Sequence, residues 1–260
     1  MSNGSNKPWI QPEWPGKDAV KILITHREGG VSQPPYDCLN LGAHVGDDPE
    51  SVAANRLILG TFLPSDPIWL NQTHGTTVFD ADHWVPYGPS GYTEPPAADA
   101  AIATLPNFVL SIMTADCLPV LLASTDGQVI GAAHAGWRGL SAGILEATVS
   151  AMRRKVAKDD LEIQAYLGPA IGPMAFQVGE EVRAIFVLHD HHSDAAFKAC
   201  DEPGKFMADI YQLAKLRLQA VGVTSIEGGC ECTFQNERFY SYRRDRITGR
   251  MASLIWKSNS

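Results

Sequence analysis

The sequence lacks the features of a membrane-spanning or exported protein. In its 260 residues no window approaches the roughly 18 apolar residues of a membrane-spanning helix. Residues 1–17 contain no basic stretch followed by an apolar run, so we expect no signal peptide and a cytoplasmic location. The 5 cysteines are scattered and odd in number, unlike a disulfide framework. We therefore expect reduced thiols that are free for metal binding or catalysis.

Basic residues are fewer than acidic residues. The chain has 21 Lys and Arg against 29 Asp and Glu, a formal net charge of −8. This balance offers no extended basic surface for a nucleic-acid backbone or an anionic membrane, so we expect neither as a partner. A small anion can still bind, because it requires only a local cationic pocket.

The secondary-structure pattern is that of a mixed α+β fold. Runs rich in Val, Ile and Leu predict strands at 19–25, 68–72, 109–113, 118–123, 129–133, 163–167 and 251–256. Helical periodicity predicts helices at 49–62, 140–156 and 208–221. Because strands cluster and helices do not alternate regularly with them, we expect mixed sheets flanked by helices. We expect an N-terminal extension at 1–18 and a single catalytic domain at 19–257.

Two stretches rich in Gly and Pro, residues 28–48 and 85–98, predict long loops. Neither resembles an interdomain linker, because strong patterns resume on both sides. Structureless stretches of this length in a compact domain are usually functional or mobile, so both are candidates to line a pocket.

Three short segments each place a potential metal ligand beside a residue that breaks regular structure. They are Asn71–Gly75 with His74, Thr114–Pro119 with Cys117, and Ala132–Gly139 with His134. Two imidazoles and a thiolate suit zinc, and three protein ligands leave a fourth position open, as in catalytic sites. The spacing matches no compact zinc-finger pattern. The residues alone therefore also allow a structural reading, with a buried thiol and hydrogen-bonded histidines.

These segments, together with residues 168–173, 176–179 and 239–245, closely resemble the YfiH family over about residues 19–256. The resemblance implies zinc-dependent phosphorolysis of adenosine, inosine and methylthioadenosine to free base and ribose 1-phosphate, with adenosine deamination as a side activity. It implies that His74, Cys117 and His134 are the metal ligands and catalytic residues. It also implies a mixed β-sheet sandwich similar to the cytotoxic necrotizing factor catalytic domain. Purine nucleoside and phosphate are then the partners of a monomer or small homo-oligomer.

For the phosphate we expect Arg27, ahead of a Gly-Gly turn, and Arg138, at a helix start where N–H groups lack partners. Arg138 could equally pair with a surface carboxylate. Asn40, His44 and Gln72 lie in segments that could face the pocket.

Other polar residues near these motifs are expected to play supporting roles. Arg243 and Arg244, next to two tyrosines, could line a ligand site or have a structural role, and we favour the structural role. Asp99 and Asp116 are candidates for acid–base or ligand-supporting groups, although carboxylates in loops more often cap turns.

One alternative is a Cys-His hydrolase that cleaves an amide bond, such as one in a peptidoglycan precursor, with Cys117 as nucleophile and His134 as base. A binding module stabilised by structural zinc would need a fourth ligand, for which Cys38 is the nearest candidate.

Two further metal-dependent classes have less support. A copper polyphenol oxidase needs several ligand sets, but among the 8 histidines only His189, His191 and His192 cluster. The nucleobase deaminase signature is incomplete, because His26-Arg27-Glu28 is followed by no Pro-Cys-x-x-Cys.

Overall fold

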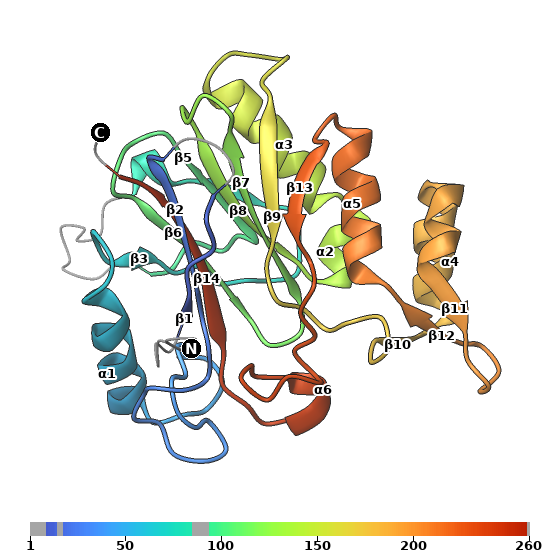
Figure 1. The fold of residues 1–260 in the computed structure, drawn as a ribbon, viewed down its shortest axis with the longest axis horizontal. Coiled ribbons are helices and arrows are strands. Elements are labelled where there is room, and N and C mark those ends of the chain that lie inside the picture. Colours follow the sequence, from blue (N-terminus) through green and yellow to red (C-terminus); the bar gives the residue numbers. More distant parts are fainter. Residues whose placement is uncertain (1–8, 15–17, 85–93, 259–260) are drawn as a thin grey trace, which may run out of the picture.

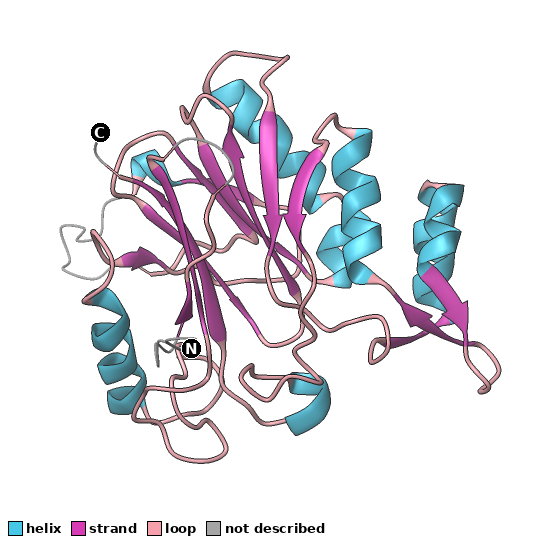
Figure 2. Cartoon of the chain, viewed as in Figure 1, coloured by secondary structure: helices cyan, strands magenta, loops and turns pink. Residues whose placement is uncertain are grey.

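Two large β-sheets pack face to face, with helices on both outer sides (Figures 1 and 2). The structure is a computed structural model that describes residues 9–14, 18–84 and 94–258. One sheet runs in the order β13 (Ser225–Gly228), β9 (Ile163–Leu167), β7 (Leu118–Ser124), β8 (Ile130–Ala135), β5 (Ala100–Ala103), β4 (Val78–Asp80). The other runs β1 (Trp9–Ile10), β2 (Val20–Thr25), β14 (Met251–Lys257), β6 (Val109–Thr114), β3 (Pro67–Ile68). The expected mixed α+β fold is confirmed.

The strand β7 shows why the central strands are apolar throughout. Successive side chains of a strand point to opposite faces. Leu118, Val120 and Leu122 pack towards the helices, whereas Leu121 and Ala123 pack against the other sheet. Both faces are therefore buried, and no polar alternation remains to be seen in the sequence.

Three helices cover the outer face of the six-stranded sheet: α2 (Trp137–Ala142), α3 (Ile144–Lys155) and α5 (Ile210–Ala220). The sequence predicted one continuous helix at 140–156, and this was wrong. The helix is divided at Gly143, which has a left-handed backbone with φ of 100°. Glycine adopts this conformation without the clash that a Cβ would cause.

The helix α1 (Pro49–Gly60) and residues 28–48 lie against the five-stranded sheet. Asp48 caps the helix by accepting hydrogen bonds from two backbone N–H groups, and Pro49 follows as expected. On the buried side of this helix, the Asn55 side chain donates to the carbonyl oxygens of Cys38 and Asn40 and accepts from Val31 N. A single buried amide thus holds the long loop against the helix.

A smaller unit lies at the right of Figure 1, where the sequence predicted no elements. It contains a three-stranded sheet in the order β10 (Gln177–Gly179), β12 (Lys205–Ala208), β11 (Phe197–Ala199). Between β10 and β11 the chain forms α4 (Glu180–His189) and a 3₁₀ helix (His191–Ala196). Strands of three or four residues are too short to produce a recognisable pattern. A second 3₁₀ helix (Ala81–His83) and α6 (Tyr242–Asp245) complete the described elements.

The predicted strand at 68–72 ends early, at Ile68. Beyond this point the Gln72 side-chain amide takes the place of a backbone partner. Its Nε2 donates to Met113 O and its Oε1 accepts from Met113 N, both at 2.9 Å. The backbone is thereby released from the sheet just before the loop that carries His74.

The boundaries predicted at the N-terminus differ in part from the structure. Within the expected extension at 1–18, β1 pairs antiparallel with β2 and so belongs to the sheet. Residues 1–8 and 15–17 lie outside the described residues, as do 85–93 of the predicted loop at 85–98. None of the described helices is both long and apolar enough to cross a membrane.

Candidate metal centre

The β7–β8 hairpin brings two of the expected ligands together. Its strands are in register with Pro119 opposite His134 and Leu118 opposite Ala135. Cys117, immediately before β7, therefore reaches the end of β8. The preceding strand β6 belongs to the other sheet, so the short connection that carries Cys117 passes from one sheet to the other.

The third ligand comes from the loop after β3. His74 has a positive φ of 62°, a conformation that few residues other than glycine adopt. The donor atoms of His74, Cys117 and His134 all lie within 4.8 Å of one another. His134 is buried, Cys117 is half-buried and His74 is exposed. The structure thus brings all three sequence-predicted ligands into one cluster.

This donor set fits a zinc ion. Two imidazole nitrogens and one sulfur match its preference for borderline and soft ligands. Within the described part of the chain, no fourth His, Cys, Asp or Glu joins the group. The cluster has a glycine, Gly136, packed against it, where an added Cβ would lie 2.8 Å from His74 Nδ1 and 3.0 Å from Cys117 Sγ. The space around the donors is therefore kept free of side-chain atoms.

Asp99 fixes the positions of His74 and His134 through hydrogen bonds. Its buried carboxylate accepts hydrogen bonds from Thr73 N at 3.1 Å, Thr73 Oγ1 at 2.9 Å, His74 N at 2.8 Å and Gly75 N at 2.7 Å. His134 Nδ1 lies 2.9 Å from the same carboxylate. One side chain therefore fixes both the loop that carries His74 and the ring orientation of His134, leaving the other ring nitrogen for the metal.

The charges of this network are mutually dependent. Burial opposes ionisation of Asp99, but hydrogen bonds from His134, Gly75 and Thr73 hold its pKa well below the usual range. Burial also acts to lower the pKa of His134, yet hydrogen bonds to Asp99 and Cys117 outweigh it and raise the pKa to about 9. For His74, partial burial of the imidazole and then the charge of His134 lower the pKa. A metal held at the cluster would take the place of the proton on one ring nitrogen of His134.

Asp116 supports Cys117 in a similar way. It has a positive φ of 98°, and its carboxylate accepts from Thr233 Oγ1 and Arg243 N, each at 2.7 Å. Its carbonyl accepts from Ile171 N at 2.9 Å. Three segments therefore converge on the residue before the thiol. Asp99 and Asp116 both have positioning roles in the structure.

A pocket of about 420 Å³ opens beside the three donors. Apart from them it is lined by His44, Gln72, Met113, Thr114, Ala115, Asp116, Trp137, Arg138, Ile171, Phe176, Tyr242, Arg243 and Arg250. The expected substrate residues His44, Gln72 and Arg138 are among them.

The other two expected substrate residues, Arg27 and Asn40, do not line this pocket. Arg27 pairs with Asp37 at 3.0 Å. The buried Asn40 side chain donates to Asp47 Oδ2 and accepts from Arg250 N. Asn40 therefore lies behind a pocket residue.

Arg250 was not expected at the pocket, and for Arg243 a structural role was favoured over a ligand-lining one. With Arg138 they place three guanidinium groups at the pocket, and none of the three forms a salt bridge with a described carboxylate. Arg243 and Arg250 instead donate to backbone carbonyl oxygens, and Arg138 lies over the Trp137 ring at 4.4 Å. The pocket is therefore cationic. Arg250 lies at the end of a turn just before β14. His74, Cys117 and His134 were recognised at the same type of position, where a strand meets a turn.

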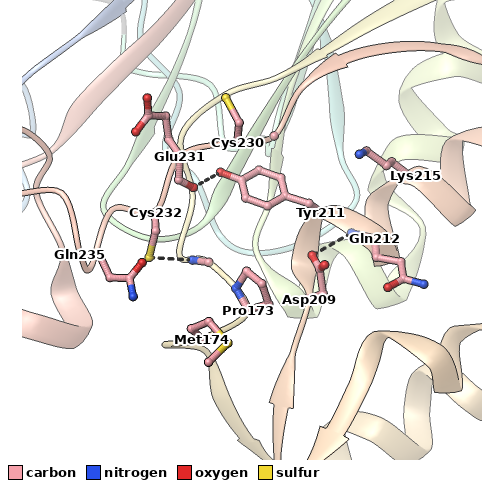
Figure 3. Close-up of a pocket in the computed structure, with 12 residues that line it drawn as sticks. Pro173, Met174, Asp209, Tyr211, Gln212, Lys215, Cys230, Glu231, Cys232 and Gln235 are labelled. Carbon is pink, nitrogen blue, oxygen red and sulfur yellow. Dashed lines mark hydrogen bonds between the residues drawn. The ribbon is translucent and has the colours of Figure 1, made fainter.

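A second pocket of about 440 Å³ contains two other cysteines (Figure 3). Cys230 is exposed, and Cys232 Sγ accepts a hydrogen bond from Gly172 N at 3.2 Å. Neither thiol belongs to the donor cluster, and neither does Cys38. The structure therefore does not supply Cys38 as a fourth ligand.

The chain is similar to known proteins over nearly its whole length. A family model described as multi-copper polyphenol oxidoreductase laccase matches residues 21–258. A purine nucleoside phosphorylase of Pseudomonas aeruginosa is 51% identical over 249 residues, which are 95% of this chain and 98% of that protein. The purine nucleoside phosphorylase YfiH of Escherichia coli is 50% identical, with the same coverage. The crystal structure of a Neisseria meningitidis protein, 44% identical, matches with a TM-score of 0.87 and covers 97% of this chain and 100% of that chain.

Substitution of Gly136 by alanine is expected to remove the metal and leave the fold intact. The added Cβ would be 2.8 Å from His74 Nδ1, too close for the ring to keep its position. Zinc content after dialysis should fall towards zero, while the circular dichroism spectrum is unchanged. Gly60→Ala is the matched control, because a Cβ there would meet nothing within 4 Å. Full zinc retention by Gly136→Ala would contradict the three-ligand centre.

Substitution of Asp99 by asparagine is expected to weaken zinc binding by about 10- to 100-fold, the range seen when a group that orients a histidine ligand is lost. The amide cannot accept all of the hydrogen bonds that the carboxylate accepts. Competition with a chelator of known affinity measures the change. Asp82→Asn is the control, because Asp82 accepts comparable bonds from Thr104 and Leu105 away from the pocket. Equal zinc affinities of the two variants would show that Asp99 does not organise the centre.

Proposed function

Because the chain belongs to the YfiH family, we propose that it is a zinc-dependent purine nucleoside phosphorylase that cleaves adenosine, inosine and methylthioadenosine with phosphate. The names of relatives about half identical to it support the reaction. For this chain, the observation that carries the proposal is a cationic pocket that opens directly onto three zinc-type donors. Phosphorolysis needs both an anion subsite and a site for the nucleoside within reach of each other.

The anion subsite is assigned to Arg138 and Arg250. Both guanidinium groups are close enough to the centre to contribute to the lowered pKa of His74, after burial and the charge of His134. Neither has a described carboxylate partner, so each can bind phosphate without breaking a salt bridge. Guanidinium groups bind phosphate through paired hydrogen bonds, which fix its orientation as well as its charge.

His44 lies on the same side of the pocket. Burial, then the charges of Arg250 and Arg56, lower the pKa of His44 below its usual range. These effects favour the neutral imidazole, which can donate one hydrogen bond and accept another. A neutral ring beside Arg250 suits the sugar hydroxyls of a nucleoside.

A zinc ion held by His74, Cys117 and His134 would supply a Lewis acid at the wall of the pocket. Around it, Asp99 holds His134 in position, and Asp116 holds the backbone next to Cys117. Adenosine deamination is proposed as a side activity, because the pocket that accepts the nucleoside is open to water. A multi-copper centre is not favoured, since the described residues supply a single cluster of this kind at the pocket.

A second candidate function is favoured by one observation. Asp99, His134 and Cys117 are connected by hydrogen bonds in series, as in a Cys-His hydrolase with an orienting carboxylate. Without metal, this arrangement could activate the thiol for attack on an amide bond. With metal, the thiolate is a ligand and is a poor free nucleophile.

One assay series separates these functions. Protein purified without added metal is expected to contain about one zinc per chain and to convert adenosine to adenine and ribose 1-phosphate only when phosphate is present. Removal of zinc with a chelator should abolish this activity, and zinc should restore it. Inosine formed without phosphate would indicate deamination alone. Activity that rises on zinc removal and disappears on alkylation of Cys117 would instead support the hydrolase.

Substitution of Arg250 by alanine is expected to raise the KM for phosphate at least about tenfold, equivalent to about 1.4 kcal/mol, with a smaller change in the KM for adenosine. Arg138→Ala should act in the same direction. Arg27→Ala should change the phosphate KM less, because Arg27 pairs with Asp37 and lies outside the pocket lining. Steady-state kinetics with varied phosphate measure all three. If Arg27→Ala has the largest effect, the phosphate binds elsewhere.

A further inference from the structure

A second group of metal donors lies at the corner where α4 ends and the 3₁₀ helix begins. It consists of Asp190, His191 and His192, whose donor atoms are all within 4.8 Å of one another. We propose that this corner binds one divalent transition-metal ion of the Zn²⁺, Ni²⁺ or Cu²⁺ class, independently of the pocket centre. The proposal concerns a different part of the chain and does not rest on the proposed reaction.

The donor separations suit such an ion. Bonds of about 2.0–2.2 Å from zinc to nitrogen and oxygen place tetrahedral donors about 3.3 Å apart. Asp190 Oδ1 lies 2.9 Å from His192 Nδ1 and 3.9 Å from His191 Nδ1. The two distances lie on either side of the required value. Each distance is therefore within about 0.6 Å of the separation that two donors of a tetrahedral ion need.

The backbone beneath these side chains is already fixed. The Asp190 side chain accepts a hydrogen bond from His192 N at 3.0 Å, which starts the 3₁₀ helix. Ser193 and Ala196 on this helix are buried. The two imidazole rings face each other, with centroids 3.9 Å apart and an angle of 37° between planes. Binding of a metal ion would therefore order only the donor side chains and not the backbone beneath them, which favours affinity.

The exposure of the donors defines the kind of site. The side chains of His191 and His192 are 82% and 69% exposed. Water can therefore complete the coordination shell. Two imidazoles and a carboxylate select zinc, nickel and copper over magnesium or calcium, which prefer all-oxygen shells. The capping bonds of Asp190 use Oδ1, so Oδ2 can also serve as a ligand.

The chain contains a matched control in a second His-Asp pair. His83 is 79% exposed and its Nδ1 lies 3.4 Å from Asp80 Oδ2. This pair offers only two donors of this kind, and Lys155 already binds the Asp80 carboxylate at 2.8 Å. It has the same residue types and similar exposure but lacks the third ligand. It should therefore not hold a metal at concentrations that fill the proposed site.

The experiment titrates Zn²⁺, and separately Ni²⁺, into full-length protein that carries Cys117→Ser, so that the pocket centre is weakened. Isothermal calorimetry should show one equivalent bound. Addition of His191→Ala and His192→Ala should abolish this binding, whereas addition of His83→Ala should leave it unchanged. In the wild-type background, the same double substitution should lower the total bound zinc by one equivalent and leave phosphorolysis unchanged.

The wild-type measurement serves if the Cys117→Ser protein does not fold. Binding that is unaffected by the double substitution would overturn the proposal, as would equal losses from His191→Ala with His192→Ala and from His83→Ala. No heat and no uptake of either metal by the Cys117→Ser protein, when it is folded by circular dichroism, would overturn it as well. Failure of phosphorolysis would not affect any of these outcomes.

Discussion

The arrangement of the centre depends on the hydrogen bonds of one buried carboxylate, that of Asp99. Burial of an isolated anion is costly, and here the cost is offset by hydrogen bonds from Thr73, His74, Gly75 and His134. These donors come from a loop and from a strand end that are distant in sequence. They meet only when the sheets have their native register. The three candidate donors are therefore brought together by the fold, and the Asp99 carboxylate that positions two of them would be costly to bury without these hydrogen bonds.

The two-sheet architecture explains why the pocket lies where it does. The connection after β6 leaves one sheet and enters the other, and it carries Asp116 and Cys117 with it. Arg250, immediately before β14, reaches the same place from the five-stranded sheet, while His134 comes from the end of β8 in the six-stranded sheet. Metal donors and cationic groups thus approach from different sheets. Their relative positions are set by the apolar layer between the sheets, which is well packed and resists displacement.

The sequence predicted the central strands, because a buried apolar run is a local feature that can be recognised without knowledge of its partners. For His74, Cys117 and His134 the residues alone left a structural reading open, and the resemblance to the YfiH family singled them out. The structure places their donor atoms in one cluster. The early end of the strand at Ile68 could not be recognised from local features, because it depends on an amide that bonds Met113 across 41 positions. The break at Gly143 was overlooked because the apolar periodicity of a helix continues on both sides of this left-handed glycine. Arg250 was missed although it follows a glycine and precedes a strand, a local signal of the kind that marked the three donors.

The charge of the pocket is opposite to that of the chain. The protein has a net charge of −8, yet three arginines line the pocket, and among the lining residues that the structure describes Asp116 is the only carboxylate. Backbone carbonyls hold Arg243 and Arg250, and an aromatic ring supports Arg138. These contacts take the place of salt bridges to carboxylates. Carbonyl groups orient a guanidinium but do not cancel its charge. A small anion that enters the pocket would meet these three guanidinium groups at short range, whatever the net charge of the chain. The local charge of the pocket is therefore a consequence of how these three side chains are held.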